Sequence, residues 1–383
     1  MTITVTGGPA YGLSWDKTAD TYARVASATG LTAGASFNGI APWSQMRRCN
    51  LWDNGVATAW YGDRCYTDTD VANMGQCMVH IPKFYYYMEY DTGTTTYYWF
   101  ITTDSSATID VGLGVGAQAV KVHPAFSRDS VIKDRIFIGA YASYYNTSTT
   151  AAESKAGIAP KVSATMPDAR IYARTRVSGG LNKWEVQDYL STCAIQLLYL
   201  LEYGGFDSQT LLGGGLTSAA GLQLTGLTAA YGNASYGVTA DRTHAMSYRG
   251  IENVYGNYRI LIDGINIKAN DNPWVADHDF STNLGAFAHP YIDTGLTLSG
   301  VDGAYTTDIA TNATYDYGFL PSAATGGSAT TKLSDWCNRS VGNQSIVYNG
   351  GTYNDGTYVG MFYIAYITSP NYAFTTFRLM YIG

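Results

Sequence analysis

Few side chains of this chain are placed to do acid–base or nucleophilic chemistry. Charged residues make up only 14% of its 383 residues. Glu202 and Glu252 are acids of the type that hydrolyse glycosidic bonds in pairs. Glu202 follows a leucine-rich segment and Glu252 begins a strand-like one, and such positions favour buried, hydrogen-bonded structural acids instead. A Ser-His-Asp hydrolase lacks its anchor, because the chain contains no G-x-S-x-G motif.

The candidate metal ligands of the chain are its histidines and the acidic residues of one loop. The five histidines are His80, His123, His244, His278 and His289. The sequence ADHDF places His278 between Asp277 and Asp279, and imidazole and carboxylate groups both bind metals. Consecutive residues seldom converge on one ion, so a polar loop is favoured. Asp271, Asp277 and Asp279 are the best calcium candidates, but no EF-hand loop is present. We therefore expect no metal and no cofactor.

The cysteines show no pattern of a zinc site or a disulfide framework. They are Cys49, Cys65, Cys77, Cys193 and Cys337, at wide spacings and without a C-x-x-C pair. Five thiols in a chain of this length do not form a disulfide scaffold. We expect free thiols that are buried as small apolar side chains.

The most distinctive composition lies in residues 348–383, which read YNGGTYNDGTYVGMFYIAYITSPNYAFTTFRLMYIG. After Arg339 the only formally charged side chains are Asp355 and Arg378. Tyrosine offers a broad amphipathic contact at a small loss of rotamer entropy, while Asn, Ser, Thr and Gly adapt their hydrogen bonds. A catalytic site would instead concentrate titratable groups. This tail is therefore predicted to contact another macromolecule.

Within the tail, Phe362, Ile364 and Phe377 suit the core. The predicted ligand contacts lie around these three positions and are aromatic or small. They are Tyr348, Asn349, Tyr353, Asn354, Thr357, Tyr358, Tyr363, Ala365, Tyr366, Thr368, Asn371 and Tyr372. The alternative is that some of these tyrosines pack inside the sheet.

Composition and charge narrow the class of protein. The 42 glycines and 33 tyrosines exceed ordinary usage, which favours short strands and tight turns. A net charge of −7 without a cluster of Lys and Arg argues against nucleic acid as a partner. The N-terminal sequence MTITVTGGPAYGL shows no signal peptide, and no apolar run reaches membrane-spanning length. Synthesis in a reducing cytoplasm is expected.

Strand patterns recur along most of the chain. Residues 1–75 predict a small β-rich module. Residues 78–90 predict one long strand with Pro82 at an edge or bulge, and residues 94–102 complete a hairpin after a turn at 91–93. Further strands are predicted within 121–126, 135–143, 249–269 and 377–382, and residues 270–331 read as loop with short ribbons.

One helix is strongly predicted, at residues 184–203. Apolar residues recur there at helical spacing, and Gly204-Gly205 marks its end. Weaker helix signals lie near residue 155 and at residues 334–338. Together the elements predict an α+β fold, with a mixed antiparallel sheet and one prominent helix.

Two spans resemble a known superfamily. GIENVYGNYRILIDG at 250–264 resembles the G-N-V-W-E-W strand of formylglycine-generating-enzyme-like domains, and residues 348–379 resemble their closing R-G-G-S-W…G-F-R segment. The resemblance implies a C-type-lectin-type fold over residues 76–383. Tyr353 stands where the motif has Trp, and Thr375-Thr376 precedes Phe377 where Gly is usual. Only Cys337 lies in the last part of the chain, so the reactive cysteine pair of those enzymes, and their activity, are not carried over.

A narrower resemblance is to phage tail-tip and receptor-binding proteins. PWSQMRRCNLWDNG (42–55), MVHIPKFYYY (78–87), VHPAF (122–126) and MSYRGIENVYGNYRILIDGINI (246–267) are similar to stretches of such proteins. That family includes the variable proteins of diversity-generating retroelements, in which mutation at template adenines randomises codons near the C-terminus. The resemblance implies a variable region at about 348–378. A fixed-specificity tail protein is the alternative.

The resemblance implies a function in host attachment. The expected protein is not an enzyme but a virion tail protein, which binds a host cell-surface protein or glycan and also other phage tail proteins. Residues 1–75 would attach or assemble it, and a homotrimer is expected because tail-tip proteins often assemble around a fibre axis. The rival function is a phage depolymerase or another enzyme that acts on surface glycans.

Overall fold

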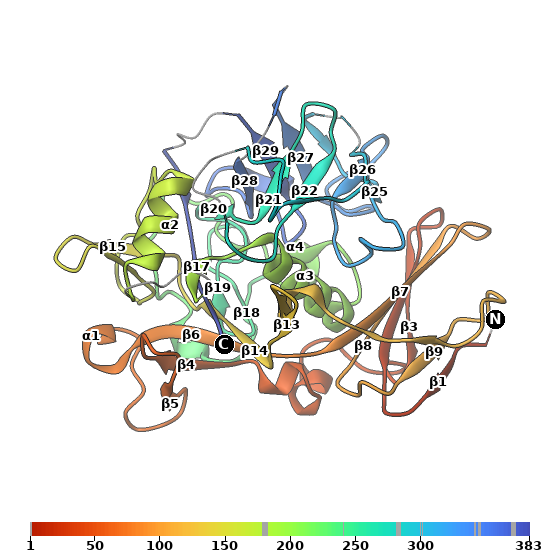
Figure 1. Cartoon of the computed structure of the whole chain (residues 1–383), viewed down its shortest axis with the longest axis horizontal. Helices are drawn as coiled ribbons and strands as arrows, with labels where there is room; N and C mark the ends of the chain where they lie inside the picture. The colour runs from red at the N-terminus through yellow and green to blue at the C-terminus, as the bar shows by residue number, and fades with distance from the viewer. Residues whose placement is uncertain are drawn as a thin grey trace.

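The computed structural model describes residues 2–177, 183–239, 241–280, 285–298, 300, 302–340, 342–343, 346–368 and 373–383. Three larger sheets surround one buried helix (Figure 1). Residues of all three sheets and of the helix share one hydrophobic cluster, which includes Trp15, Ile138, Leu198 and Val347. The burial of this shared apolar surface holds the sheets together.

The first six-stranded sheet has the order β17-β31-β14-β6-β4-β5. Its strands are Trp184–Val186, Leu379–Ile382, Arg135–Gly139, Gln76–Pro82, Arg47–Leu51 and Ala57–Trp60. The last strand of the chain, β31, therefore pairs with β14 and β17 in the interior of a sheet.

The five-stranded sheet has the order β11-β7-β8-β2-β3. Its strands are Lys121–Val122, Tyr85–Asp91, Thr96–Thr102, Tyr11–Asp16 and Thr21–Ala26. The predicted β7–β8 hairpin is present, but its turn lies at 92–95 rather than at 91–93. All seven residues of β8 are buried. Helix α3 and neighbouring loops cover one face of the strand, and the small β1-β9-β10 sheet covers the other.

The second six-stranded sheet has the order β24-β27-β29-β28-β20-β30 and carries most of the tail. Its strands are Ala304–Tyr305, Trp336–Arg339, Ile364–Ile367, Ile346–Asn349, Arg259–Ile262 and Thr375–Thr376. Two pairings are parallel, β27 with β29 and β20 with β30, so the sheet is mixed.

Short ribbons complete the β structure. The three-stranded sheets are β1 Thr4–Thr6, β9 Thr108–Asp110 and β10 Gln118–Ala119, and β21 Ile265–Ile267, β22 Pro273–Val275 and β23 Ile292–Asp293. The two-stranded ribbons are β12 Ser127–Arg128 with β13 Val131–Ile132, β15 Tyr144–Asn146 with β16 Ala151–Glu153, β18 Ser247–Tyr248 with β19 Ile251–Glu252, and β25 Asp308–Ile309 with β26 Pro321–Ala323.

The helices of the described residues are short except for α3. They are α1 Val71–Met74, α2 Met166–Arg174, α3 Tyr189–Tyr203 and α4 Ser208–Leu211, with single 3₁₀ turns η1 Ala35–Gly39, η2 Trp43–Gln45, η3 Pro124–Phe126, η4 Ala229–Tyr231 and η5 Gly356–Tyr358. The side chain of Asp188 accepts from Ser191 N at the start of α3, and Gly204 ends it in the left-handed conformation at φ 77°, as the Gly-Gly signal predicted.

Helix α3 differs from its prediction in two ways. It begins five residues later, because Trp184–Val186 pairs with β31 as a strand. It is also buried on every side, since all its residues from Tyr189 to Glu202 lie inside. Figure 1 shows the reason: α3 lies between β6–β14 on one side and β20–β28 on the other. A second sheet thus covers the face of α3 that the amphipathic sequence pattern predicted to be exposed to solvent.

The predicted α+β class with one prominent helix is wrong. Over the described residues the protein is β-rich, with 33% strand, 13% helix and several small sheets. Residues 334–338, a weak helix prediction, largely form β27 instead. Pairing between strands that are distant in the sequence outweighs the local helical periodicity here. The C-type-lectin-type architecture was predicted together with the α+β class, and it is not retained.

Residues 1–75 do not form sheets of their own. Strands β2 and β3 join β7 and β8, while β4 and β5 join β6. The predicted long strand at 78–90 is two strands, β6 and β7, which belong to different sheets. The chain passes from one sheet to the next just after Pro82, the residue expected to lie at an edge or bulge.

Candidate functional site

The tail residues predicted to contact a ligand divide into buried and exposed groups. Tyr348, Tyr363, Ala365 and Tyr366 are buried, with 3% or less of each residue exposed. They cannot contribute a contact surface, so their assignment to one is corrected. Asn371 and Tyr372 lie outside the described residues.

The burial follows from two covered sheet faces. Tyr348 pairs with Ala365 across β28 and β29, and both pack with Tyr363 in one cluster. Tyr366, on the other face, packs in the large central cluster, and its hydroxyl lies 3.5 Å from Cys337 Sγ. Alternation along a strand separates core from surface only when one face meets water. The alternative interpretation of the tyrosines, packing inside the sheet, is correct for these three.

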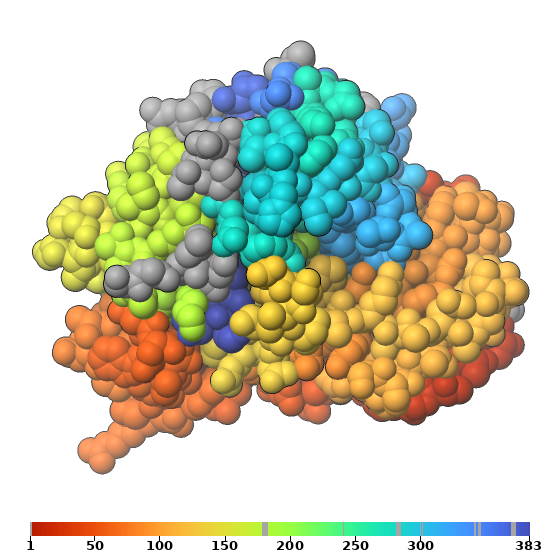
Figure 2. Space-filling model, in the orientation of Figure 1, coloured from red at the N-terminus to blue at the C-terminus, as the bar shows by residue number. Residues whose placement is uncertain are grey.

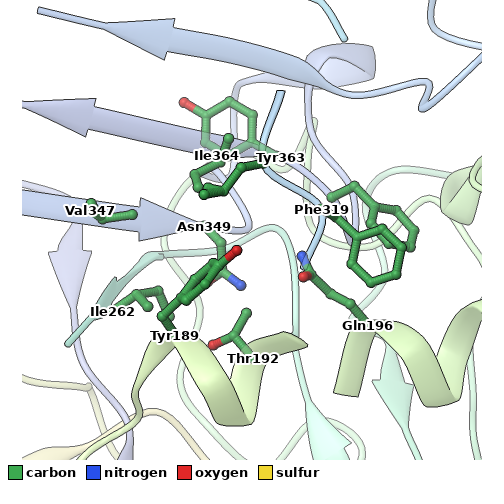
Figure 3. Close-up of a pocket in the computed structure, with 11 residues that line it drawn as sticks. Tyr189, Thr192, Gln196, Ile262, Phe319, Val347, Asn349, Tyr363 and Ile364 are labelled. Atoms are coloured by element: carbon green, nitrogen blue, oxygen red, sulfur yellow. The ribbon is translucent and has the colours of Figure 1, made fainter. Parts of the chain in front are cut away.

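Asn349 is also buried and lines an internal cavity rather than the surface. The cavity, of about 20 Å³, lies between α3 and the tail-bearing sheet. Figure 3 shows Tyr189, Thr192 and Gln196 reaching it from α3, opposite Asn349. Such a volume holds about one water molecule. The cavity is therefore too small for a substrate.

The exposed group lies, apart from Thr368, in one short segment. Asn354, Thr357, Tyr358 and Thr368 are exposed, and Tyr353 is half-buried. Except for Thr368, all lie in residues 350–359, which we call the display loop. The display loop joins β28 to the stretch before β29 and contains η5. Most of the predicted contact residues that the structure shows at the surface lie in this loop.

An aromatic cluster lies beside the display loop. Tyr358 is 49% exposed, and its ring centroid lies 4.6 Å from that of Trp336 and 5.9 Å from that of Tyr305. Trp336 and Tyr305 contact each other edge-on at 4.9 Å, and both are partly exposed. The Tyr305 hydroxyl lies 3.3 Å from Thr357 Oγ1. Three aromatic rings thus meet Thr357 of the display loop in one patch.

Sequence reasoning missed Tyr305 and Trp336. Tyr305 stands in the polar region assigned to loop, and Trp336 stands within the weak helix prediction at 334–338. Each is a large aromatic residue in a locally polar segment, GAYTT and SDWCN, and that is the signal that could have pointed to them. Pairing of β24 with β27 places them opposite each other.

The backbone of the display loop is held by segments distant in sequence. Gly356 N donates to Thr217 O at 2.7 Å, and Ala219 N donates to Tyr353 O at 2.8 Å. Gln209 Nε2 donates to Gly356 O at 2.8 Å and to Val359 O at 2.5 Å. These bonds fix the main chain while the side chains of Asn354, Thr357 and Tyr358 face solvent.

Two acidic side chains hold the main chain in and next to the display loop. Asp355 Oδ2 accepts from Thr352 N at 2.8 Å and forms an ion pair with Arg259 at 3.3 Å. Asp335 is fully enclosed and accepts from Phe362 N at 2.7 Å, and burial raises the pKa of its carboxyl well above the usual range. Asp355, one of the two charged residues of the tail, therefore braces the loop, while Asp335 holds the main chain at Phe362, just beyond it.

Gly351 shows why the tail needs its glycine pair. It has φ 62°, and a Cβ at this position would lie 2.1 Å from Val359 Cγ1. Only glycine allows the close approach of the two ends of the display loop.

The two acids considered for glycoside hydrolysis are structural. Glu202 is buried and forms a two-pronged ion pair with Arg249. Glu252 is buried and accepts from Gly226 N, Thr228 N and Thr228 Oγ1 at 2.7–2.9 Å. Desolvation raises the pKa of both carboxyls. Both residues are shielded from solvent, with 0% of Glu202 and 2% of Glu252 exposed, so neither carboxyl is at the surface where it could reach a glycan.

The candidate metal ligands are engaged in other contacts. Asp271 pairs with Arg339 at 2.5 Å, and His278 Nδ1 contacts the Asp277 carboxylate. Within the described residues, no three His, Cys, Asp or Glu side chains are grouped closely enough to hold a metal.

All five cysteines are free. Burial is confirmed for four of them, and the prediction is wrong for Cys65, which is exposed. Burial raises the pKa of the Cys337 thiol to about 12, so this tail cysteine is a weak nucleophile at neutral pH.

Comparisons with known proteins identify no relative, so the proposed function rests on the geometry of the site. No protein-family model matches the sequence, and no curated protein is significantly similar to it. Among the helices that the structure describes, none combines the length and the apolar character needed to span a membrane.

Proposed function

We propose that the protein binds a receptor on a host cell surface, as a phage tail-tip or retroelement-diversified variable protein does. The observation that carries the proposal is the patch formed by Tyr358, Trp336 and Tyr305 with the exposed side chains of the display loop. Partly exposed aromatic rings surrounded by small polar groups are typical of binding surfaces.

The fixed backbone of the display loop supports the same function. A loop that is ordered before binding loses less conformational entropy when a ligand arrives. Hydrogen bonds donated by Gln209 and Ala219 and accepted by Thr217 O provide this order without using the exposed side chains. The exposed positions can therefore change identity while the loop keeps its conformation.

The proposed partners and location are those implied by the resemblance to phage tail proteins. The ligand is a host cell-surface protein or glycan, the protein resides in a virion tail beside other tail proteins, and it assembles as a homotrimer. A light-scattering mass of 41.4 kDa at high concentration would contradict the trimer.

Binding to intact cells tests the proposed surface. Fluorescently labelled protein is screened against a panel of bacterial strains, and affinity is measured on each strain that retains it. Tyr358→Ala is expected to weaken binding about 30-fold, the effect of losing an interface hot spot. Tyr231→Ala is the matched control, because Tyr231 is a similarly exposed tyrosine at η4. Unchanged affinity in the Tyr358 variant, or equal loss in the control, would contradict the assignment.

A further inference from the structure

A groove at the edge of the five-stranded sheet lies away from the display loop. It has a volume of about 430 Å³, which lies within the range of ligand-binding sites. Its floor is β7, and its walls come from the chain before β11 and from the connection between β25 and β26. The lining residues are Tyr87, Met88, Glu89, Tyr90, Val115, Gln118, Lys121, Thr311, Asn312, Ala313 and Asp316. In Figure 2 the light-blue wall lies next to the orange atoms of the β7–β8 hairpin.

The lining shows that the groove follows the edge of β7. Four consecutive residues of the strand, from Tyr87 to Tyr90, contact it. Successive side chains of a strand point to opposite faces, so a groove on one face would meet only every second residue. A groove that meets all four lies along the main chain of the strand.

This edge of β7 is unpaired. Strand β11 pairs only with Tyr85 and Tyr86, at the beginning of β7. Over the residues that the structure describes, no strand pairs with the outer edge of Tyr87–Tyr90, and no loop backbone bonds to it. The edge therefore keeps main-chain donors and acceptors free.

The orientation of these groups follows from a bond at the start of the strand. His123 N donates to Phe84 O at 3.2 Å, so the carbonyl of Phe84 points to this edge. In an antiparallel ladder, every second residue turns both its N–H and its C=O to the same side. Met88 and Tyr90 therefore direct their N–H and C=O groups into the groove.

The charge in the groove favours a basic ligand group. Lys121 and Asp316 neutralise each other in an ion pair, and Asp316 Oδ1 also accepts from Tyr86 OH at 2.5 Å. Glu89 accepts from Tyr87 OH, and among the described residues it has no cationic partner. One carboxylate charge is thus left for a ligand.

We propose that the β7 edge binds an extended polypeptide segment of a partner protein, which adds as a strand beside Met88 and Tyr90 and places a basic side chain opposite Glu89. Strand addition supplies main-chain hydrogen bonds to an exposed edge, and side-chain pockets add specificity. The walls on both sides of this edge hinder pairing with the edge of another sheet, which limits aggregation.

The test uses a synthetic library of random heptapeptides and the full-length protein. Peptides selected on the wild type are screened again on Ala313→Trp, which fills the groove, and on Ala33→Trp as the control at an exposed alanine outside it. We expect peptides that bind the wild type and the control at least tenfold more tightly than Ala313→Trp. If no peptide shows this difference, or if neutral maltotriose binds in the same groove-dependent way and no peptide does, the proposal is wrong.

N-methylation of the selected peptides gives the sharper criterion. Methylation should weaken binding at every second residue, because alternate N–H groups of an added strand face β7. Glu89→Gln should weaken peptides with a basic residue at the matching position more than peptides without one. Losses without a period of two would exclude strand addition and overturn the proposal.

Discussion

Glu202 and Arg249 form a buried ion pair in which two nitrogens of one guanidinium meet both oxygens of one carboxylate. Arg249 Nε donates to Oε2 at 3.0 Å, and Nη2 donates to Oε1 at 2.5 Å. Arg249 Nη1 also donates to Asn38 Oδ1 at 2.8 Å, so the pair joins the end of α3 to the N-terminal part of the chain. Glu202, which was considered with Glu252 as a catalytic pair, instead connects distant segments of the chain.

Glu202→Gln should therefore lower stability rather than remove an activity. The substitution leaves the Arg249 charge buried without its partner, which costs about 3–5 kcal/mol. Asp53→Asn is the control, because Asp53 meets Arg176 in a similar pair at 2.6 Å but is 42% exposed. A loss under about 1 kcal/mol is expected there. Urea unfolding compares the two variants, and equal losses would contradict the structural role of Glu202.

Display-loop residues and core residues should differ in their effect on folding. Asn354→Ser and Thr357→Ala change exposed side chains and should alter the free energy of unfolding by no more than about 0.5 kcal/mol. Phe362→Ala should cost about 3–5 kcal/mol, because Phe362 is buried and packs edge-on against Phe206 at 4.7 Å. Chemical denaturation measures all three. Similar losses in both groups would show that the display loop is a packing element.

Gln209→Ala should loosen the display loop without changing any side chain predicted to contact the ligand. The amide of Gln209 bonds to Gly356 O and Val359 O, and its oxygen accepts from Arg242 Nε at 2.6 Å. Loss of these bonds should cost about 1–3 kcal/mol and speed hydrogen exchange of the amides between 352 and 358. Gln223→Ala is the control, since within the described part of the chain Gln223 Nε2 donates only to the nearby Gly221 O. Unchanged exchange in the Gln209 variant would show that other contacts order the loop.

Stability should fall between pH 7 and pH 5 because of His123. Burial, and to a smaller extent Arg128, lowers the pKa of His123 to about 3. The unfolded chain takes up a proton below about pH 6.5 and the folded chain does not, so this contribution is present above that pH and is progressively lost as the pH falls. The loss should reach about 2 kcal/mol at pH 5.

His123→Asn isolates this effect. Its amide oxygen can replace His123 Nδ1 in accepting from Ala125 N, but it does not titrate. The difference in unfolding free energy between pH 7 and pH 5 should be about 2 kcal/mol smaller in the variant. The same pH dependence in both proteins would place the titration elsewhere.

Local sequence signals predicted the elements whose stabilising contacts are local. The glycine pair after Tyr203 ends α3, and the turn after Asp91 closes the β7–β8 hairpin. Both depend on conformations that neighbouring residues specify. By contrast, Trp184 lies in a strand despite its helical pattern, because its partner is Tyr381, almost two hundred residues away.

The sequence by itself determined that the tail is rich in tyrosine and small polar residues, poor in charge and equipped with a glycine turn. Only the tertiary structure decided which of those residues meet solvent. Tyr348 and Tyr366 have the same local composition around them as Tyr358, but layers on both faces of the tail-bearing sheet enclose them. Tyr358 is exposed because the loop leaves that sheet, and contact with Trp336 and Tyr305 depends on pairing between β24 and β27. Burial is set by what packs against a residue, and those partners come from parts of the chain that no local pattern identifies.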